Sequence, residues 1–337
     1  MGKKNVVVNN YLADKERFAD LFNVVIFEGK QVVCADDLTD MDTKVWRVSQ
    51  SGHDRVYDEF VRDQLKQWKY GTRLLVLGLE PENEVHYALP VKLMNYESLQ
   101  YNRNYKDIKK KHRERKDLSS KEYVSGFGKN DYLNPVLTIV LYHGKNKWDA
   151  PETLHEMMDF NGMPEEIREK IKMYCNDFRI HLLDVNKMEN IERYATDLRE
   201  VFGFLIRQND KNALKEYVGT NEEFRHLKED TYEVISMLSH SDLLGMRKED
   251  YKRERGYDMC LAIDEMMRDA RKEGMATGIE RGIERGIERG IERGINLRNH
   301  QIVLEMLGDH QSVEKIIRYT KLPLDYIHQV EKEMLEK

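Results

Sequence analysis

The chain has 337 residues, long enough for about two domains, and combines 34% charged residues with a formal net charge of -6 at pH 7. No apolar stretch approaches the roughly 18 residues of a membrane-spanning helix, and the first residues lack the apolar segment of a secretory signal, so we expect a cytoplasmic protein that makes no membrane contact. The three cysteines lie far apart, which argues against a disulfide framework and against a cysteine zinc site.

Hydrophobic periodicity predicts helices and strands in mixed order, which favours an α/β fold. The expected elements are a helix at 13–25, a linker at 36–40, a strand at 73–80, a helix at 88–115, a polar loop at 119–131, a strand at 136–142, helical segments at 154–158 and 164–171, a strand at 178–183 and helices at 189–218. The strand at 73–80 is apolar except for Gly78, which is typical of a buried strand.

Acidic residues mark the end of this buried strand. Glu80 and Glu82 are two residues apart, so their side chains leave the same face if the extended backbone continues past Pro81. A turn near 69–72 would bring Asp63 back to the same strand end. Hard cations such as Mg²⁺ take a few carboxylate oxygens and complete their shell with water and phosphate. The pattern predicts a half-exposed metal site, and ordinary solvated carboxylates are the alternative.

The surrounding sequence carries a family resemblance. Its segments are Arg62-Asp63, Leu77-Gly-Leu-Glu80-Pro-Glu82, Val85-His-Tyr-Ala-Leu-Pro-Val-Lys92 with Tyr96, the early Asp14-Lys-Glu-Arg-Phe-Ala-Asp-Leu-Phe22, Leu133-Asn-Pro-Val-Leu-Thr-Ile-Val-Leu-Tyr142 with Gly144, Trp148-Asp-Ala-Pro151 and Thr196-Asp-Leu-Arg199. In this order they resemble the Rpn family of recombination-promoting nucleases, also called transposases, of the PD-(D/E)XK superfamily. The resemblance covers roughly residues 10–205.

The resemblance implies a DNA endonuclease that depends on Mg²⁺ or Mn²⁺ and has a PD-(D/E)XK-like core. By position, Asp63 and Glu80 match the metal ligands. Glu82, the third catalytic candidate, stands where the family has Gln and the superfamily has Lys, and its charge would repel a phosphate unless a metal lay between them. Lys92, where relatives tend to carry Arg, is the expected phosphate contact. The departures leave a catalytically impaired DNA-binding relative as an alternative.

The second half of the helix at 88–115 is strongly basic. Residues 103–116 contain eight basic and two acidic side chains, and Tyr residues recur earlier on the same helix. Such a face can bind phosphates, so we expect DNA contacts from Lys109, Lys110, Lys111 and Arg113. A solvated helix end is the alternative.

The C-terminal part contains four successive Gly-Ile-Glu-Arg repeats that start at Gly278. Each glycine in a helix costs about 1 kcal/mol relative to alanine, so the segment is either a close-packed dimer stalk or a semi-flexible tether. Short helices are expected from Gln301, Ser312 and Pro323. The expected divisions are 10–220, a nuclease core with a helical extension; 221–273, a charged helical region; 274–297, a repeat stalk; and 298–337, a small helical unit. A structural protein that forms homo-oligomers through 274–297 is a further functional alternative.

Overall fold

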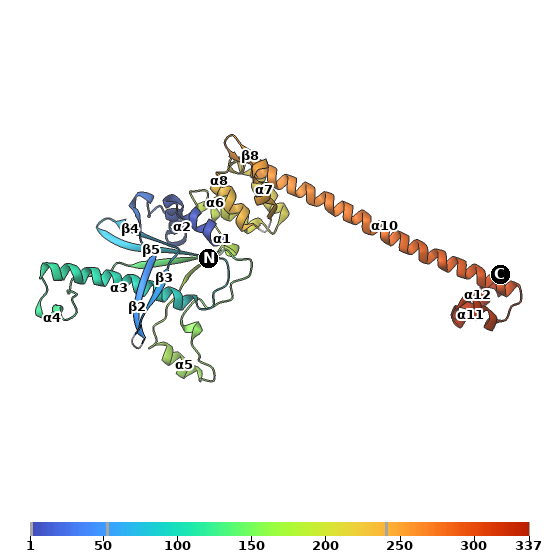
Figure 1. The fold of residues 1–337 in the computed structure, drawn as a ribbon, viewed down its shortest axis with the longest axis horizontal. Helices are drawn as coiled ribbons and strands as arrows, with labels where there is room; N and C mark the ends of the chain where they lie inside the picture. The colour runs from blue at the N-terminus through green and yellow to red at the C-terminus, as the bar shows by residue number, and fades with distance from the viewer. Residues whose placement is uncertain (1–2, 52–53, 240–241, 337) are drawn as a thin grey trace. The chain divides into compact units, whose positions relative to one another are not determined.

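The computed structural model describes residues 3–51, 54–239 and 242–336 (Figure 1). The chain forms two compact units, Met1–Asp264 and Glu265–Lys337. The first unit contains a five-stranded mixed sheet with helices, and the described residues of the second are helical. This mixed composition agrees with the α/β class expected from the sequence and is compatible with a nuclease-like core. Among the described residues, no helix is both long enough and apolar enough to cross a membrane.

The elements have the following bounds. The strands are β1 (Leu38–Asp40), β2 (Lys44–Ser51), β3 (Asp54–Val61), β4 (Gln64–Tyr70), β5 (Arg73–Glu82), β6 (Val136–Tyr142), β7 (His181–Asp184), β8 (Lys252–Arg253) and β9 (Gly256–Tyr257). The helices are α1 (Lys3–Leu12), α2 (Lys15–Phe27), α3 (Leu89–Arg115), α4 (Ser120–Tyr123), α5 (Glu165–Lys172), α6 (Leu198–Arg207), α7 (Lys211–Thr220), α8 (Glu229–Leu238), α9 (Asp242–Met246), α10 (Met259–Gly308), α11 (Val313–Thr320) and α12 (Leu324–Leu335).

Strand β5 is the centre of the sheet, whose order is β1-β4-β5-β6-β7. It pairs antiparallel with β4 and parallel with β6, and β7 continues the parallel half. Residues 76–81 are all buried, because a strand covered on both faces is apolar along its whole length rather than at alternate positions. The strand continues past Pro81 to Glu82, which satisfies the condition for Glu80 and Glu82 to share a face.

A tight turn joins β4 to β5. Tyr70 pairs with Arg73, and Gly71 between them has a φ of 60°, a left-handed conformation that glycine adopts without steric cost. This is the turn expected near 69–72, and its register decides which residues meet at the far end of the hairpin.

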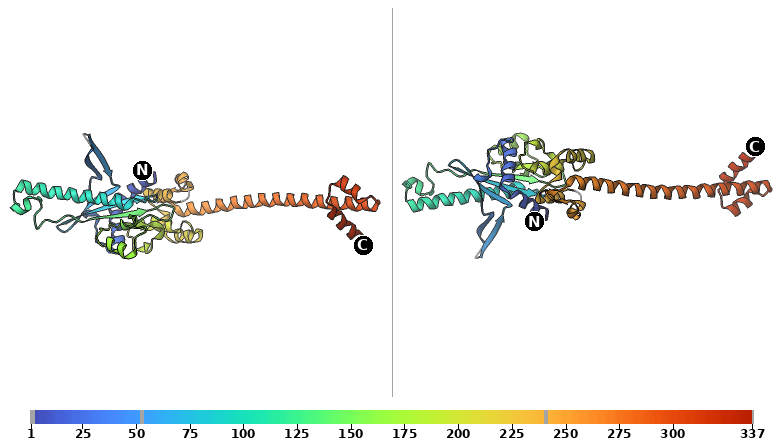
Figure 2. Two further views of the ribbon diagram at one scale, coloured as in Figure 1. Left: turned by 90° about the horizontal axis from the view of Figure 1, so that it is seen from below. Right: turned by 90° about the horizontal axis from the view of Figure 1, so that it is seen from above.

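Helix α3 covers one face of the sheet with its first turns only. Leu89, Leu93 and Tyr96 belong to a hydrophobic cluster with Val140 and Tyr142 of β6. The rest of the helix extends beyond the sheet, with α4 and its loops beside the helix end (Figure 2). The same helix therefore belongs to the core at its start and to the surface at its end.

The structure corrects several expectations, among them the polar loop at 119–131, which contains helix α4. Residues 36–40, expected as a linker, form a 3-10 turn and edge strand β1, which pairs with β4. The hairpin of β2 and β3 was not expected, because pairing can stabilise strands that lack an apolar pattern. Residues 154–158 contain the 3-10 turn His155–Met157, not an α-helix. The helix expected from Gln301 is the end of α10 rather than a separate element.

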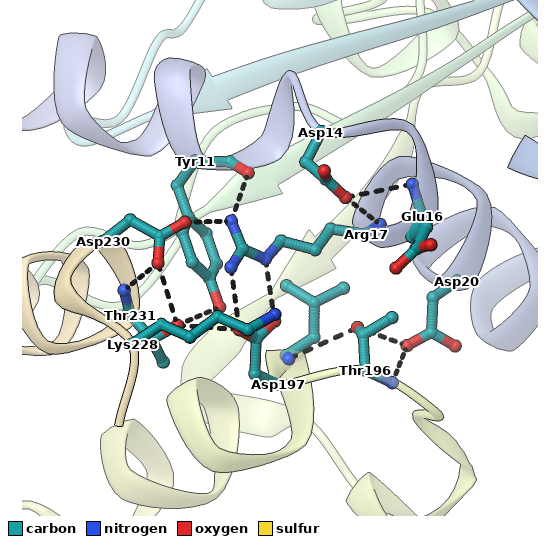
Figure 3. Close-up of polar contacts among 11 residues, drawn as sticks. Tyr11, Asp14, Glu16, Arg17, Asp20, Thr196, Asp197, Lys228, Asp230 and Thr231 are labelled. Carbon is teal, nitrogen blue, oxygen red and sulfur yellow. Dashed lines mark hydrogen bonds and ion pairs between the residues drawn. The ribbon is translucent and has the colours of Figure 1, made fainter. Parts of the chain in front are cut away.

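A buried network around Arg17, here called the Arg17 clasp, joins helices α1, α2, α6 and α8 (Figure 3). The Arg17 guanidinium donates two parallel hydrogen bonds of 2.7 Å to Asp197 and one of 2.5 Å to Asp230. It also lies 3.8 Å from the centroid of the Tyr11 ring. Thr231 donates to Asp197 at 2.7 Å. Burial raises the pKa of Asp197, but the bonds from Arg17 and Thr231 hold the pKa below its usual value.

A second carboxylate strengthens the same junction. Asp20 of α2 accepts hydrogen bonds from the backbone of Ala195 and Thr196 and from the Thr196 hydroxyl at 2.6 Å. The early helix segment at 14–22 and the segment at 196–199, which both carry the family resemblance, therefore pack against each other. The hydrogen bonds between these two segments stabilise the fold.

The second unit contains most of α10 together with α11 and α12. Val303, Ile316, Ile327 and Val330 form its hydrophobic core. Along the repeat, the isoleucines from Ile279 to Ile295 are 54–60% exposed, and a Cβ added to any repeat glycine would meet nothing within 4 Å. The domain boundaries expected at 220, 273 and 297 and the homo-oligomer expected through 274–297 stay predictions.

Replacing Arg17 by Ala should lower the free energy of unfolding by about 3 kcal/mol, because Asp197 would lose its two-bond guanidinium partner and keep only Thr231 and the 3.8 Å ion pair with Lys228. Urea denaturation measures the loss. The matched control is Arg103→Ala, which removes an exposed arginine from α3. If both variants lost less than about 1 kcal/mol, the clasp would not be an important source of stability.

Candidate active site

Asp63 and Glu80 lie at the same end of the β4–β5 hairpin. Gln64 of β4 pairs with Leu79 of β5 in the antiparallel register. The next residue beyond this pair is Asp63 on the β4 side and Glu80 on the β5 side. The two carboxylates interact electrostatically, since the charge of Asp63 is one cause of the raised pKa of Glu80. The hairpin therefore brings Asp63 back beside the end of β5, as the turn near 69–72 predicts.

Glu80 is far more buried than the sequence indicates. It is only 1% exposed, whereas a half-exposed ligand was expected. Arg62 donates a hydrogen bond of 3.2 Å from Nε to Glu80 Oε1. Burial raises the pKa of Glu80 to about 7, an effect that exceeds the opposing influence of Arg62 and Lys92. The carboxylate therefore changes its protonation state near neutral pH.

Arg62 fits beside Glu80 because residue 78 has no side chain. A Cβ at Gly78 would lie 2.9 Å from Arg62 Cζ and closer still to Nη2, too close for any real contact. The guanidinium is 2% exposed, donates a 2.8 Å bond from Nη2 to Thr138 Oγ1 and lies 5.4 Å from the Tyr96 ring. A glycine inside a buried strand often marks such a close approach, and it is the sequence signal that could have identified this arginine.

Lys92 of α3 lies between the two glutamates of β5. Its Nζ is 2.8 Å from Glu82 Oε1 and 3.8 Å from Glu80 Oε2. Burial lowers the pKa of Lys92, but the bond and charge of Glu82 and the charge of Glu80 raise it above its usual value, so the side chain stays a cation. The helix therefore places a lysine beside the carboxylates of β5, and this lysine neutralises Glu82.

Helix α1 contacts Asp63, the second carboxylate of the site. Asn9 donates a 2.9 Å hydrogen bond from Nδ2 to Asp63 Oδ1, and Gln64 Nε2 donates to the Asn9 carbonyl at 2.7 Å. Burial raises the pKa of Asp63, whereas Asn9 and Lys92 lower it. No sequence pattern indicates Asn9, because it lies 54 residues before Asp63 and outside the segments that carry the resemblance.

Several buried polar atoms, some of them on the side chains of this site, have no hydrogen-bond partner among the described residues of the protein. Within the part of the chain that the structure describes, they include Asn5 Oδ1, Arg62 Nη1, Gln64 Oε1, Gln100 Nε2 and both ring nitrogens of His143. Asn5 lies one turn before Asn9, and the His143 backbone N–H donates to the Glu82 carbonyl.

The donor set suits a hard cation that keeps most of its own water. Nowhere in residues 3–51, 54–239 and 242–336 do three or more His, Cys, Asp or Glu side chains stand close enough to hold a metal ion. Asp63 and Glu80 nevertheless supply two carboxylates at one strand end. Mg²⁺ often takes one or two protein carboxylates and completes its shell with water and substrate phosphate. The residues present therefore fit Mg²⁺ or Mn²⁺ and do not fit a closed structural metal site.

The expected DNA contacts lie well away from the carboxylates. Lys110, Lys111 and Arg113 are exposed and Lys109 is half-buried on the second half of α3. From Lys92 to Lys109 the helix rises about 25 Å at 1.5 Å per residue. These cations do not reach Glu80, and they form a separate surface on the same helix.

Comparison with known proteins finds a similar family for part of the chain. The family model described as "Putative transposase, YhgA-like" matches residues 77–231. No curated protein and no solved structure matches the chain. The matched region begins within β5, so it contains Glu80, Glu82 and Lys92 but not Asp63. Residues 77–231 are thus similar to a family of the PD-(D/E)XK superfamily, and the finer resemblance to Rpn proteins stays a prediction.

Proposed function

We propose that the chain is a metal-dependent DNA endonuclease of the recombination-promoting nuclease and transposase type. The observation that carries the proposal is the meeting of Asp63, Glu80 and Lys92 at one end of the β4–β5 hairpin. Two carboxylates and a cation in one partly buried place match the needs of phosphodiester cleavage, where negative charge builds up on the scissile phosphate.

Each side chain has a role in this proposal. Asp63 and Glu80 would hold Mg²⁺ or Mn²⁺, which supplies charge stabilisation and a more acidic bound water. Lys92 would contact the scissile phosphate, and Glu82 orients Lys92 through their 2.8 Å contact. Arg62 and Asn9 act through the carboxylates that they bond, so they are positioning residues.

The proposed substrate is DNA. The exposed cations Lys110, Lys111 and Arg113 extend from the site along α3, where they can bind successive phosphates. A catalytically impaired DNA-binding relative is the main rival, since Glu82 replaces the family's Gln. A structural oligomer is the other rival, because the isoleucines of the repeat are exposed.

Wild-type protein should nick supercoiled plasmid with Mg²⁺ or Mn²⁺ but not with EDTA. Asp63→Asn and Glu80→Gln should each lower the rate at least about 100-fold, since they remove ligand charge while they keep side-chain shape. Circular dichroism melts check that both variants fold. Asp159→Asn, an exposed carboxylate outside the site, is the control. A wild-type protein that binds DNA but never nicks it would favour the binding-only rival.

Removing either charge of the Lys92–Glu82 pair tests the proposed phosphate contact. Lys92→Met should reduce nicking by about 100-fold, the effect of removing one charge-stabilising donor. Glu82→Gln should raise nicking, because Lys92 would lose its competing carboxylate and the new side-chain amide could donate to the phosphate. Unchanged rates in both variants would place this pair outside the reaction.

The nicking rate should depend on the ionisation of Glu80. Its pKa of about 7 means that the carboxylate is mostly protonated at pH 6 and mostly ionised at pH 8. Because only the ionised form binds a cation, the rate at limiting Mg²⁺ should rise with pH and level off above neutrality. Saturating Mg²⁺ should shift the rise to lower pH, as metal binding competes with the proton. A profile that is flat from pH 5.5 to 8.5 in both conditions would contradict this role.

A further inference from the structure

The loops after α3 are ordered, although the sequence describes them only as polar. The Tyr105 hydroxyl donates to the Ser125 carbonyl. His112 lies 2.6 Å from Asp117 and 2.7 Å from Asp131, so one imidazole joins both ends of the segment. These contacts with Asp117 and Asp131 raise the pKa of His112. Residues 117–131 are therefore folded back onto the helix end (Figure 2).

Two further contacts define the conformation of this segment. Ser119 and Glu122 form a capping box at the start of α4, and the Lys129 backbone donates to Glu122 at 2.7 Å. Gly126 has a φ of 70° and lies against the stem of Lys109, where a Cβ would approach the lysine Cγ to 2.7 Å. Its tight fit against α3 distinguishes the segment from a freely solvated loop.

The ordered segment nevertheless exposes large side chains. Tyr123 is 78% exposed, Val124 87% and Tyr132 80%. An aromatic ring that contributes nothing to packing offers a free π face, which can stack on a flat ligand. Tyr123 also lines a cavity of about 550 Å³ together with Leu118.

The same cavity is basic. Lys109, Arg113 and Lys116 line it, and no carboxylate of the described residues lies within ion-pair distance of these three. The acids of the segment are occupied elsewhere, since Asp117 and Asp131 contact His112. The hydrogen bonds of Ser119 and Lys129 lower the pKa of the remaining acid, Glu122, to about 2. The cavity thus combines unpaired cations with an exposed ring.

We propose that this surface, here called the α4 platform (Lys109, Arg113, Lys116, Leu118 and Tyr123), binds unpaired nucleotides of a DNA strand. The cations would contact phosphates and the Tyr123 ring would stack on a base, the combination that single-strand binding uses. A duplex keeps its bases stacked on each other and cannot offer one to Tyr123. A phosphate-rich ligand with flat bases fits the platform better than a second copy of this acidic chain, whose net charge is -6.

The biological role of the platform rests on the proposed endonuclease function, but the binding tests do not require nuclease activity. Along α3, the platform lies about 30 Å from Lys92, a distance that corresponds to roughly nine base pairs at 3.4 Å per pair. The endonuclease would then favour DNA in which a single-stranded region lies about this far from the cleavage site. Flaps, gaps and strand-exchange junctions belong to this class of substrate.

Binding is measured by fluorescence anisotropy in EDTA, so that no cleavage is required. The probes are labelled oligo-dT and a labelled duplex of equal length. Wild-type protein should bind oligo-dT more tightly than duplex. Tyr123→Ala should weaken oligo-dT binding at least about fivefold, whereas Tyr123→Phe, which keeps the ring, should bind like wild type. Tyr174→Ala removes an equally exposed tyrosine outside the platform and serves as the control.

The charges are tested through salt dependence. Lys109→Gln combined with Lys116→Gln should reduce the slope of log affinity against log salt by about 1.4 for a single strand, which is 0.7 for each lost phosphate contact. Lys145→Gln combined with Lys147→Gln, in the loop after β6, is the matched control. An unchanged slope would overturn the phosphate contacts.

Several outcomes would refute the platform. Equal affinity for strand and duplex, together with no effect of Tyr123→Ala, would do so even if the protein nicks plasmid. A change in sedimentation caused by Tyr123→Ala, without any change in DNA binding, would show that the surface binds protein instead. Conversely, strand binding that depends on Tyr123 in a protein that never nicks would support the platform and refute the nuclease.

Discussion

The charge balance around Glu80 is the constraint on which the first unit depends. This carboxylate lies on the central strand with 1% of its surface exposed, and an isolated buried charge would be very unfavourable. Arg62 approaches it from the hairpin and Lys92 from α3, so the start of α3 must lie over the sheet. Gly78 must stay without a side chain to admit the arginine. The balance is incomplete, and a carboxyl group with a pKa near neutrality remains at the end of the central strand.

The two polar networks of the first unit divide the work between stability and chemistry. In the Arg17 clasp, the guanidinium forms ion pairs with two carboxylates and lies over the ring of Tyr11. Around Glu80, by contrast, several buried polar atoms have no partner. Satisfied networks make a structure rigid, whereas unsatisfied groups retain the capacity to bind.

Charge on this chain is informative only at the local level. A net charge of -6 would repel DNA on average. However, α3 links three environments in one direction: a core contact at Leu89, a half-buried lysine at Lys92 and a solvated basic end. Three acids that follow this end, Asp117, Glu122 and Asp131, contact His112 or cap α4, so they do not neutralise the lysines. A helix longer than the sheet it covers can in this way join a reaction site to a distant binding surface.

Local sequence patterns are sufficient to predict the features that depend on near neighbours. The apolar run of β5, the turn at Gly71, the length of α3 and the placement of Asp63 near Glu80 all follow from local periodicity and turn chemistry. Edge strand β1 and the β2–β3 hairpin were missed, because their stability comes from pairing rather than from pattern. Only the tertiary structure decided that Arg62 pairs with Glu80, that Lys92 neutralises Glu82, that Asn9 holds Asp63 and that Arg17 joins Asp197. Partners from separate elements meet only when helices dock on the sheet, and no spacing along the chain encodes the docked geometry.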